Sequence, residues 1–188
     1  MDGLIPAIEK RRAYRALSER EISEEVVERI VTAGTYAPSC FNNQPWRLVV
    51  INEEAARTKA REGLSKANGW AFKAPMYVLI VTKPDLDCRP KDGREYAFYD
   101  AGLAAMNMML QATEEGLIAH PIAGYKPAVM QEAFGIPEGF TVINVIVFGY
   151  PGDPAELDEQ KRESEQAPRS RKPMEEVVAY NRWNFKEE

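Results

Sequence analysis

Three short, uninterrupted apolar runs constrain the fold of this chain most strongly. They span residues 48–51, 76–82 and 141–148, and their length suits β-strands better than buried helices. We expect the first run, Leu48 to Ile51, to be buried on both faces of a sheet. A further extended piece is predicted over 117–125, where the sequence LIAHPIAGY ends in a glycine turn.

Segments with helical periodicity precede, separate and follow these runs. They predict helices over 3–12, 24–36, 53–67, 94–115 and 127–134, and a last helix that begins at Pro173. Ser23 and Asn52 are placed as N-caps of the second and third helices. The helix over 94–115 is apolar almost all round, which predicts burial between layers or between subunits. Strands interspersed with helices, without repeats or long linkers, predict one α+β domain over residues 1–188.

Composition excludes several classes of protein. The net charge of −5 argues against general affinity for nucleic acid or for an anionic membrane. No apolar run approaches the ~20 residues of a membrane span, and the N-terminus lacks the apolar stretch of a signal peptide. Cys40 and Cys88 have no CxxC spacing, so we expect no disulfide and a reducing, cytoplasmic location. Because His120 is the single histidine, we predict no metal site and no histidine-based triad.

A polar, turn-rich loop leads into the first apolar run. Residues 37–46 have the sequence APSCFNNQPW, in which two prolines disfavour helix and Asn42, Asn43 and Gln44 offer amide donors and acceptors. A loop of this kind, anchored by a buried strand, is suited to holding a planar polar ligand. The alternative is that Trp46 belongs to the core and that the amides only satisfy the turn.

Arginines gather near both ends of this acidic chain. The first cluster contains Arg11, Arg12 and Arg15, and the second contains Arg169 and Arg171. A guanidinium binds phosphate oxygens through two parallel hydrogen bonds, so arginines that converge in space would clamp one dianion. The alternative is that both clusters form solvated, charged surfaces.

The C-terminal part of the chain changes character after residue 152. Residues 153–172 are charged and contain prolines, which indicates a surface arm. Val177 and Val178 of the last helix are expected to face inward. Because a monomer rarely exposes two large aromatic rings, we expect Trp183 and Phe185 to dock on a partner subunit. Residues 153–188 are therefore predicted to pack on that partner.

Six motifs, in order along nearly the whole chain, resemble those of the FMN-dependent nitroreductase family, which has the flavin reductase-like fold. RRAYR at 11–15 resembles an RRSxR motif, with Ala13 in place of serine, and residues 37–46 resemble an APSxxNxQPW loop. The others are NGW at 68–70 with AP at 74–75, the helix from Asp100 to Leu117, PIAG at 121–124 and RSR at 169–171. Ala123 stands where glutamate is often found. Each motif alone is weak, and their order carries the resemblance.

This resemblance implies a nitroreductase-like α+β fold, with a central, mostly antiparallel sheet flanked by helices, in an intertwined homodimer that holds two FMN molecules at its interface. The phosphate, ribityl chain and pyrimidine edge would be bound by Arg11, Arg12, Ala13 and Arg15, and Arg169 and Arg171 would close on the phosphate. The loop of the other subunit would supply Pro38, Ser39, Cys40 and Asn42 against the ring. Asn68 would bond the pyrimidine edge, and Pro121, Ile122 and Gly124 would lie over one ring face.

The implied activity is a ping-pong oxidoreduction in which NAD(P)H passes hydride through flavin N5 to nitroaromatics, quinones or similar electron-poor small molecules. The flavin carries the chemistry, so no side chain is predicted to be catalytic. Cys40 lacks a partner base, and His120 is interpreted as structural. A lid over the flavin is expected within 83–95. The alternatives are a specialised flavoenzyme of this fold, such as a reductive dehalogenase or a flavin-consuming enzyme, a non-catalytic flavin-binding protein, and a nucleic-acid-binding protein that the acidic charge disfavours.

Overall fold

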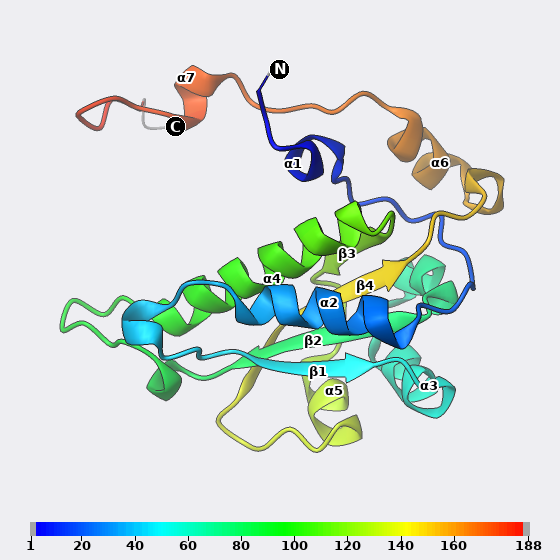
Figure 1. The fold of residues 1–188 in the computed structure, drawn as a ribbon, viewed down its shortest axis with the longest axis horizontal. Coiled ribbons are helices and arrows are strands. Elements are labelled where there is room, and N and C mark those ends of the chain that lie inside the picture. The colour runs from blue at the N-terminus through cyan, green and yellow to red at the C-terminus, as the bar shows by residue number, and fades with distance from the viewer. Residues whose placement is uncertain (1–2, 186–188) are drawn as a thin grey trace.

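A four-stranded antiparallel sheet forms the centre of the protein. The computed structural model describes residues 3–185, and its strands are β1 (Arg47–Ile51), β2 (Met76–Thr82), β3 (Ile118–Ile122) and β4 (Thr141–Gly149). They lie in the order β1-β2-β4-β3, and every neighbouring pair is antiparallel (Figure 1). The predicted antiparallel sheet is confirmed.

The two central strands carry the most continuous apolar sequence. Every residue of β2 is buried, and so are the residues of β4 from Val145 onward. In β1, by contrast, only Ile51 is buried and Arg47 is exposed. The prediction that this run is buried on both faces is wrong. β1 is an edge strand with a neighbour on one side only, so the flanking layers cover it incompletely.

Two helices cover one face of the sheet. α2 (Glu24–Thr35) and α4 (Tyr96–Glu114) pack together over it and share a core with Trp46, so the simpler interpretation of this tryptophan is correct. α4 is buried along one side only, since Tyr99 and Met106 are exposed; all-round burial is not found in the single chain. No helix within residues 3–185, α4 included, combines the length and apolar character needed to cross a membrane.

Shorter elements cover the opposite face. α3 (Glu54–Gly63), α5 (Pro127–Ala133) and the 3-10 segment η2 (Lys66–Lys73) enclose a second core that contains Ala60, Tyr77 and Met130. Gly63 approaches Met130 so closely that a Cβ there would lie 2.7 Å from the methionine methyl group. The sheet is therefore the middle of three layers, as in an α+β domain with helices on both faces.

Helix ends differ from the predicted boundaries by a few residues. α1 (Pro6–Lys10) is shorter than the predicted 3–12, and α3 ends at Gly63 because Leu64 leaves the helix and pairs with Tyr125. Ser23 does precede α2, but its side chain makes no capping hydrogen bond to the helix. Glu53, in place of the predicted Asn52, is the residue that precedes α3.

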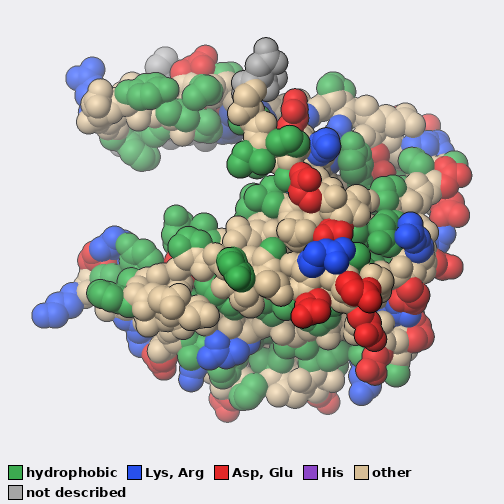
Figure 2. All heavy atoms as spheres, in the orientation of Figure 1, with side chains coloured by type: hydrophobic (Ala, Val, Ile, Leu, Met, Phe, Trp, Pro, Cys, Tyr) green, Lys and Arg blue, Asp and Glu red, His purple; other side chains and the backbone are tan. Residues whose placement is uncertain are grey.

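The C-terminal segment extends away from the sheet. After a 3-10 turn, η4 (Pro154–Glu156), and α6 (Glu159–Gln166), the chain passes α1 and continues into α7 (Met174–Val177), which stands off the body (Figures 1 and 2). Val177 is 56% exposed and Trp183 is 80% exposed. The prediction that Val177 and Val178 face inward is therefore wrong for the single chain. Residues 186–188 of the predicted arm lie outside the described residues.

Candidate functional site

Arginines from the two ends of the chain line one pocket of about 400 Å³. Arg11, Arg12 and Arg15 come from the connection between α1 and α2, and Arg169 and Arg171 come from the segment after α6. The rest of the lining is Ala13, Tyr14, Ser164, Glu165, Ala167, Pro168 and Ser170. The volume is in the range of small-molecule sites. The two predicted clusters thus meet in space.

Hydrogen bonds join these two segments. Arg12 Nη2 donates to the carbonyl of Ala167, 155 positions away, at 2.9 Å. The backbone N–H of Ala16 donates to Glu165 Oε1 at 3.1 Å, and the N–H of Arg15 donates to the same oxygen. Glu165 is buried, and its carboxylate satisfies two backbone donors that need an acceptor. This contact fixes α6 against the N-terminal segment and shapes the wall of the pocket.

The one carboxylate of the pocket lining, that of Glu165, offsets only part of the positive charge of the five arginines. Within residues 3–185, none of these five arginines forms an ion pair with a carboxylate. Burial lowers the pKa of Arg11, and the charges of Arg169 and Arg171 lower it further. Like charges that repel one another in a partly buried site favour a bound anion.

Arg169 has a second task, because it binds the C-terminal end of α1. Its Nη2 donates to the carbonyls of Glu9 and Arg11, both at 2.7 Å, and its Nη1 lies 3.4 Å from the carbonyl of Ile8. A cation at these free carbonyls is favoured by the helix dipole. A phosphate contact by Arg169 would have to use its remaining N–H groups.

A contact with Tyr14 connects His120, on the edge strand β3, to the pocket. His120 Nδ1 lies 3.0 Å from the carbonyl oxygen of Tyr14, and its ring packs on Trp70 with 4.6 Å between ring centroids. Burial lowers the pKa of His120 to about 4, and the charges of Arg15 and Arg11 act in the same direction. The ring is therefore neutral at pH 7 and donates its Nδ1–H to Tyr14. These contacts agree with a structural histidine.

Asn68 and Gly124 lie beyond Trp70. Asn68 Nδ2 donates to the carbonyl of Gly124 at 2.8 Å, and Asn68 Oδ1 accepts from Trp70 Nε1 at 3.1 Å. A Cβ at Gly124 would lie 2.6 Å from Asn68 Nδ2, so a larger residue there would displace the Asn68 side chain. Asn68 Nδ2 also donates to Ser65 Oγ, at a longer distance of 3.3 Å. The predicted hydrogen bond from Asn68 to a pyrimidine edge would have to replace this weaker contact. Pro121 and Ile122 are the last two residues of β3, and Gly124 follows the strand; Ile122 is buried and Pro121 is partly exposed.

The loop that carries Pro38, Ser39, Cys40 and Asn42 lies elsewhere, beside the N-terminal end of α4. Asp100 Oδ2 accepts the backbone N–H of Cys40 at 2.7 Å, and Ser39 Oγ accepts that of Gln44 at 2.9 Å. Phe41 has a φ of 49°, which is strained for a bulky residue, and its side chain is 92% exposed. Backbone strain under an exposed ring marks this loop as a functional candidate.

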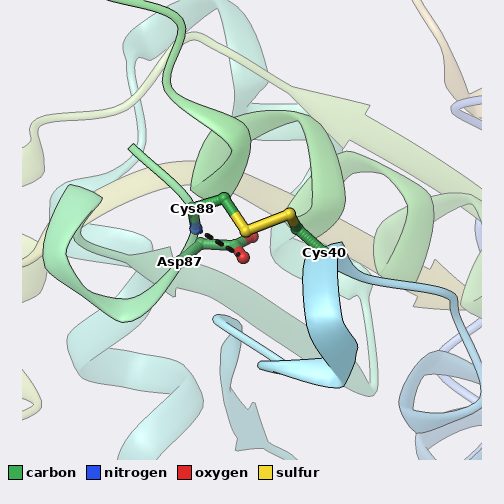
Figure 3. Close-up of side chains that lie close together, drawn as sticks. All are labelled: Cys40, Asp87 and Cys88. Carbon is green, nitrogen blue, oxygen red and sulfur yellow. Dashed lines mark hydrogen bonds between the residues drawn. A yellow bond between two sulfur atoms is a disulfide. The ribbon is translucent and has the colours of Figure 1, made fainter. Parts of the chain in front are cut away.

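Cys40 and Cys88 form a disulfide (Figure 3). It links the loop to the segment after the 3-10 turn η3 (Pro84–Leu86), 48 positions along the chain. The prediction of two unpaired cysteines is therefore wrong, because spacing in sequence does not report which cysteines approach one another in the fold. The argument from unpaired cysteines for a reducing compartment is lost with it.

Within one chain, the predicted site residues form two separate groups. The arginine pocket and Ala13 adjoin Asn68, Pro121, Ile122 and Gly124, with Tyr14, His120 and Trp70 connecting them. Pro38, Ser39, Cys40 and Asn42 lie at the opposite end of the α2–α4 layer (Figure 1). A ligand in the pocket would contact both groups only if a second chain supplied the loop.

Sequence reasoning missed six residues of the pocket lining, and the side chains of two of them, Tyr14 and Glu165, contact the first arginine cluster. Tyr14 lines the pocket and carries Arg12 over its ring, with 5.1 Å from the guanidinium carbon to the centroid. Its place between the arginines of RRAYR was the available signal. Glu165 had none, since it lies in the charged run EQKRESEQ and nothing there distinguishes the one buried carboxylate.

Comparisons with known proteins agree with this architecture. The sequence profile of the nitroreductase family matches residues 8–67 and 59–150. An Archaeoglobus fulgidus protein with the provisional name NADH dehydrogenase/NAD(P)H nitroreductase is 29% identical over 157 residues, which cover 81% of this chain and 88% of the relative. A crystal structure described as an oxidoreductase containing FMN has 27% identity and a TM-score of 0.85, covering 98% of this chain and 94% of the other. A nitroreductase family protein from Clostridium difficile 630 has 28% identity and a TM-score of 0.77, with 94% and 97% covered.

The chain shares its fold with these solved structures, an α+β fold with helices on both faces of an antiparallel sheet. The matched residues run from α1 through β4 and include the first arginine cluster, the loop at 37–46 and β3. The chain belongs to the nitroreductase family.

Proposed function

We propose that the protein is an FMN-dependent NAD(P)H oxidoreductase that reduces nitroaromatics, quinones or similar electron-poor small molecules. The observation that carries the proposal is the convergence of arginines from both chain ends in one pocket, without an ion pair among the described residues. FMN ends in a phosphate dianion, which suits such a pocket. Family membership and the similarity to an oxidoreductase containing FMN support the choice of cofactor.

The residues of the pocket have separable tasks in this proposal. Arg11, Arg12 and Arg171 would hold the phosphate through charge-assisted hydrogen bonds, and Arg169 keeps α1 in place beside them. Arg15 would place a positive charge at the pyrimidine edge of the flavin, where it favours the anionic reduced form. FMN held by these residues would supply the hydride chemistry between NAD(P)H and the second substrate.

We further propose that a second copy of the chain completes the site with its loop 37–45. The same copy would cover a groove of about 640 Å³, which α1, α2 and α4 line with Ile5, Ala33 and Leu110 among others. The loop is tied by Cys40–Cys88 to the segment 83–95, so both would approach the cofactor together. This arrangement would account for the predicted lid and for the exposed ring of Phe41.

The absorption spectrum of the purified protein tests the cofactor. We expect a yellow protein whose flavin bleaches with NADH or NADPH under anaerobic conditions and is reoxidised by a nitroaromatic or a quinone. A colourless protein that does not bind added FMN and is not stabilised by it would overturn the proposal. Bound FMN that neither nicotinamide reduces would leave a flavin-binding protein without this activity.

The pocket itself is tested by Arg11→Ala in a flavin fluorescence titration. We expect FMN binding to weaken about 10- to 100-fold, since a hydrogen bond to a charged group is worth about 1.5–3 kcal/mol. Lys10→Ala is the matched control, because Lys10 is an exposed neighbour outside the pocket lining. Its effect should stay within about twofold, as for other exposed charges. Equal losses in both variants would show that net charge matters and the pocket does not.

A further inference from the structure

Cys40, Asp87 and Cys88 form a compact cluster outside the arginine pocket. Cys40 begins the 3-10 turn η1 (Cys40–Asn42), and Asp87 and Cys88 directly follow η3. The two sulfurs and one carboxylate oxygen of Asp87 all lie within 4.8 Å of one another. Figure 3 shows the Asp87 carboxylate beside the disulfide. Two segments distant in sequence therefore present sulfur and oxygen atoms at one point.

The Asp87 carboxylate has unmet bonding capacity. Its Oδ1 accepts the backbone N–H of Cys88 at 2.8 Å and the Nδ2 of Asn43 at 3.1 Å. Its Oδ2 is buried and has no hydrogen-bond partner among residues 3–185. A buried carboxylate oxygen without a donor costs free energy, so this oxygen favours a proton or a cation beside it.

A second carboxylate adds to the negative charge. Asp100 is only 2% exposed, and its Oδ2 accepts the backbone N–H of Cys40 at 2.7 Å. In the described part of the chain, no lysine or arginine forms an ion pair with Asp87 or Asp100. A cation would stabilise this pair of carboxylates.

We propose that Cys40, Cys88 and Asp87 bind a Zn²⁺ ion when the two cysteines are reduced. Thiolate sulfur and carboxylate oxygen are both ligands that Zn²⁺ takes in a tetrahedral arrangement, and a water molecule would fill the fourth position. The sulfurs of a disulfide are not thiolates, so the oxidised protein lacks the site. The pair of cysteines therefore has two alternative states, a disulfide and a metal-bound dithiolate.

A dithiol can act as the reductant that converts the disulfide state into the dithiol state. The dithiol transfers two electrons and two protons, the Cys40–Cys88 bond breaks into two thiols, and the dithiol becomes a disulfide. Zn²⁺ then displaces the two thiol protons, which pass to solvent. Both states link the loop 37–45 to the segment after η3, and reduction without metal removes this link.

Titration of the reduced, full-length protein with Co²⁺ tests this proposal. A phosphine serves as the reductant because it leaves no thiol to compete for the metal, and a difference spectrum against cobalt-free protein removes any flavin absorbance. We expect one Co²⁺ per chain, with a thiolate-to-cobalt charge-transfer band that Zn²⁺ abolishes. The oxidised protein should give no such band. Absence of the band from the reduced protein, or equal binding by the oxidised protein, would overturn the proposal.

Variants identify the ligands. Cys88→Ser should abolish the band, and Asp87→Asn should weaken Co²⁺ binding at least about tenfold, since even outer partners of metal ligands contribute that much. Asp85→Asn is the matched control, because it changes the same charge in the same segment at an exposed residue paired with Arg89 at 2.6 Å. Its affinity should change by less than about twofold. Thermal denaturation checks that both variants are folded. Equal losses of Co²⁺ affinity in folded Asp85→Asn and Asp87→Asn would also overturn the proposal.

Discussion

Burial makes His120 a poor base in the folded chain. Its pKa is lowered from the ordinary 6.5 to about 4. Between these values the unfolded state binds more protons than the folded state, so the free energy of unfolding rises with pH. The stability that depends on neutral His120 is therefore fully present above pH 6.5, and it is lost as the pH falls towards 4. The whole shift corresponds to about 3 kcal/mol.

We predict that the wild-type protein loses about 2 kcal/mol more stability between pH 7 and pH 5 than the His120→Asn variant does. Asparagine does not titrate, and its amide retains a donor for the carbonyl of Tyr14 that His120 now contacts. Urea titrations of both proteins, at one fixed protein concentration and at each pH, measure the difference. Parallel pH dependences would show that His120 is not the group responsible.

Single residues differ in how far sequence alone could place them. Arg11 and Arg169 were predicted to meet because arginine clusters stand out in an acidic chain and occur in a recognised order of motifs, and they do line one pocket. Cys40 and Cys88 were not paired, since their approach depends on how the loop packs on the segment after η3. The burial of Glu165 depends on the backbone N–H groups of Arg15 and Ala16, which no residue pattern reports.

At the scale of elements, the packing of α2 on α4 depends on Gly34. A Cβ built there would lie 2.8 Å from Met108 Cγ and 3.4 Å from Leu48 Cδ1, and Met108 is fully buried. Alanine has a helix propensity about 1 kcal/mol better than glycine. Overpacking a core costs about 1–3 kcal/mol, so the steric term should win. We predict that Gly34→Ala lowers the free energy of unfolding by about 1 kcal/mol.

Gly102 in α4 provides the control. It is exposed, and nothing lies within 4 Å of a Cβ built on it, so Gly102→Ala should gain up to about 1 kcal/mol from propensity alone. The urea midpoints of the two variants should therefore move in opposite directions. A rise in both would mean that the α2–α4 contact adapts to the added methyl group.

The existence of the elements was easier to predict than their surroundings. The runs 48–51 and 76–82 are alike in sequence, yet β1 is an edge strand and β2 is central. Apolar content reports the tendency to form a strand, whereas burial also depends on how many neighbours the strand acquires. In the same way α3 ends at Gly63 because Leu64 pairs with Tyr125, a contact far away in sequence.

At the scale of the whole molecule, large apolar side chains remain exposed on parts that are distant in sequence. Tyr36 is 82% exposed and Trp183 is 80% exposed. Figure 2 shows apolar side chains on the protruding C-terminal arm, separated from the body. Scattered exposed apolar side chains are ordinary, but α7 and the described residues after it carry several of them and stand off the body, which indicates a missing partner surface. A second copy of this chain, with its groove between α1, α2 and α4, is the partner that we propose.

We therefore predict that the full chain is a dimer in sedimentation equilibrium and that Trp183→Ala raises its dissociation constant about 30-fold or more, as for a buried aromatic hot spot worth at least about 2 kcal/mol. Glu175→Ala is the control, because Glu175 is an exposed residue of α7 and has no aromatic ring to bury in the interface. This variant should leave the dissociation constant within about threefold. FMN should be lost on dilution in step with dissociation of the Trp183→Ala dimer, because the loop 37–45 would then leave the site. A full chain that sediments as a monomer while retaining FMN would contradict both the dimer and the contribution of the second loop.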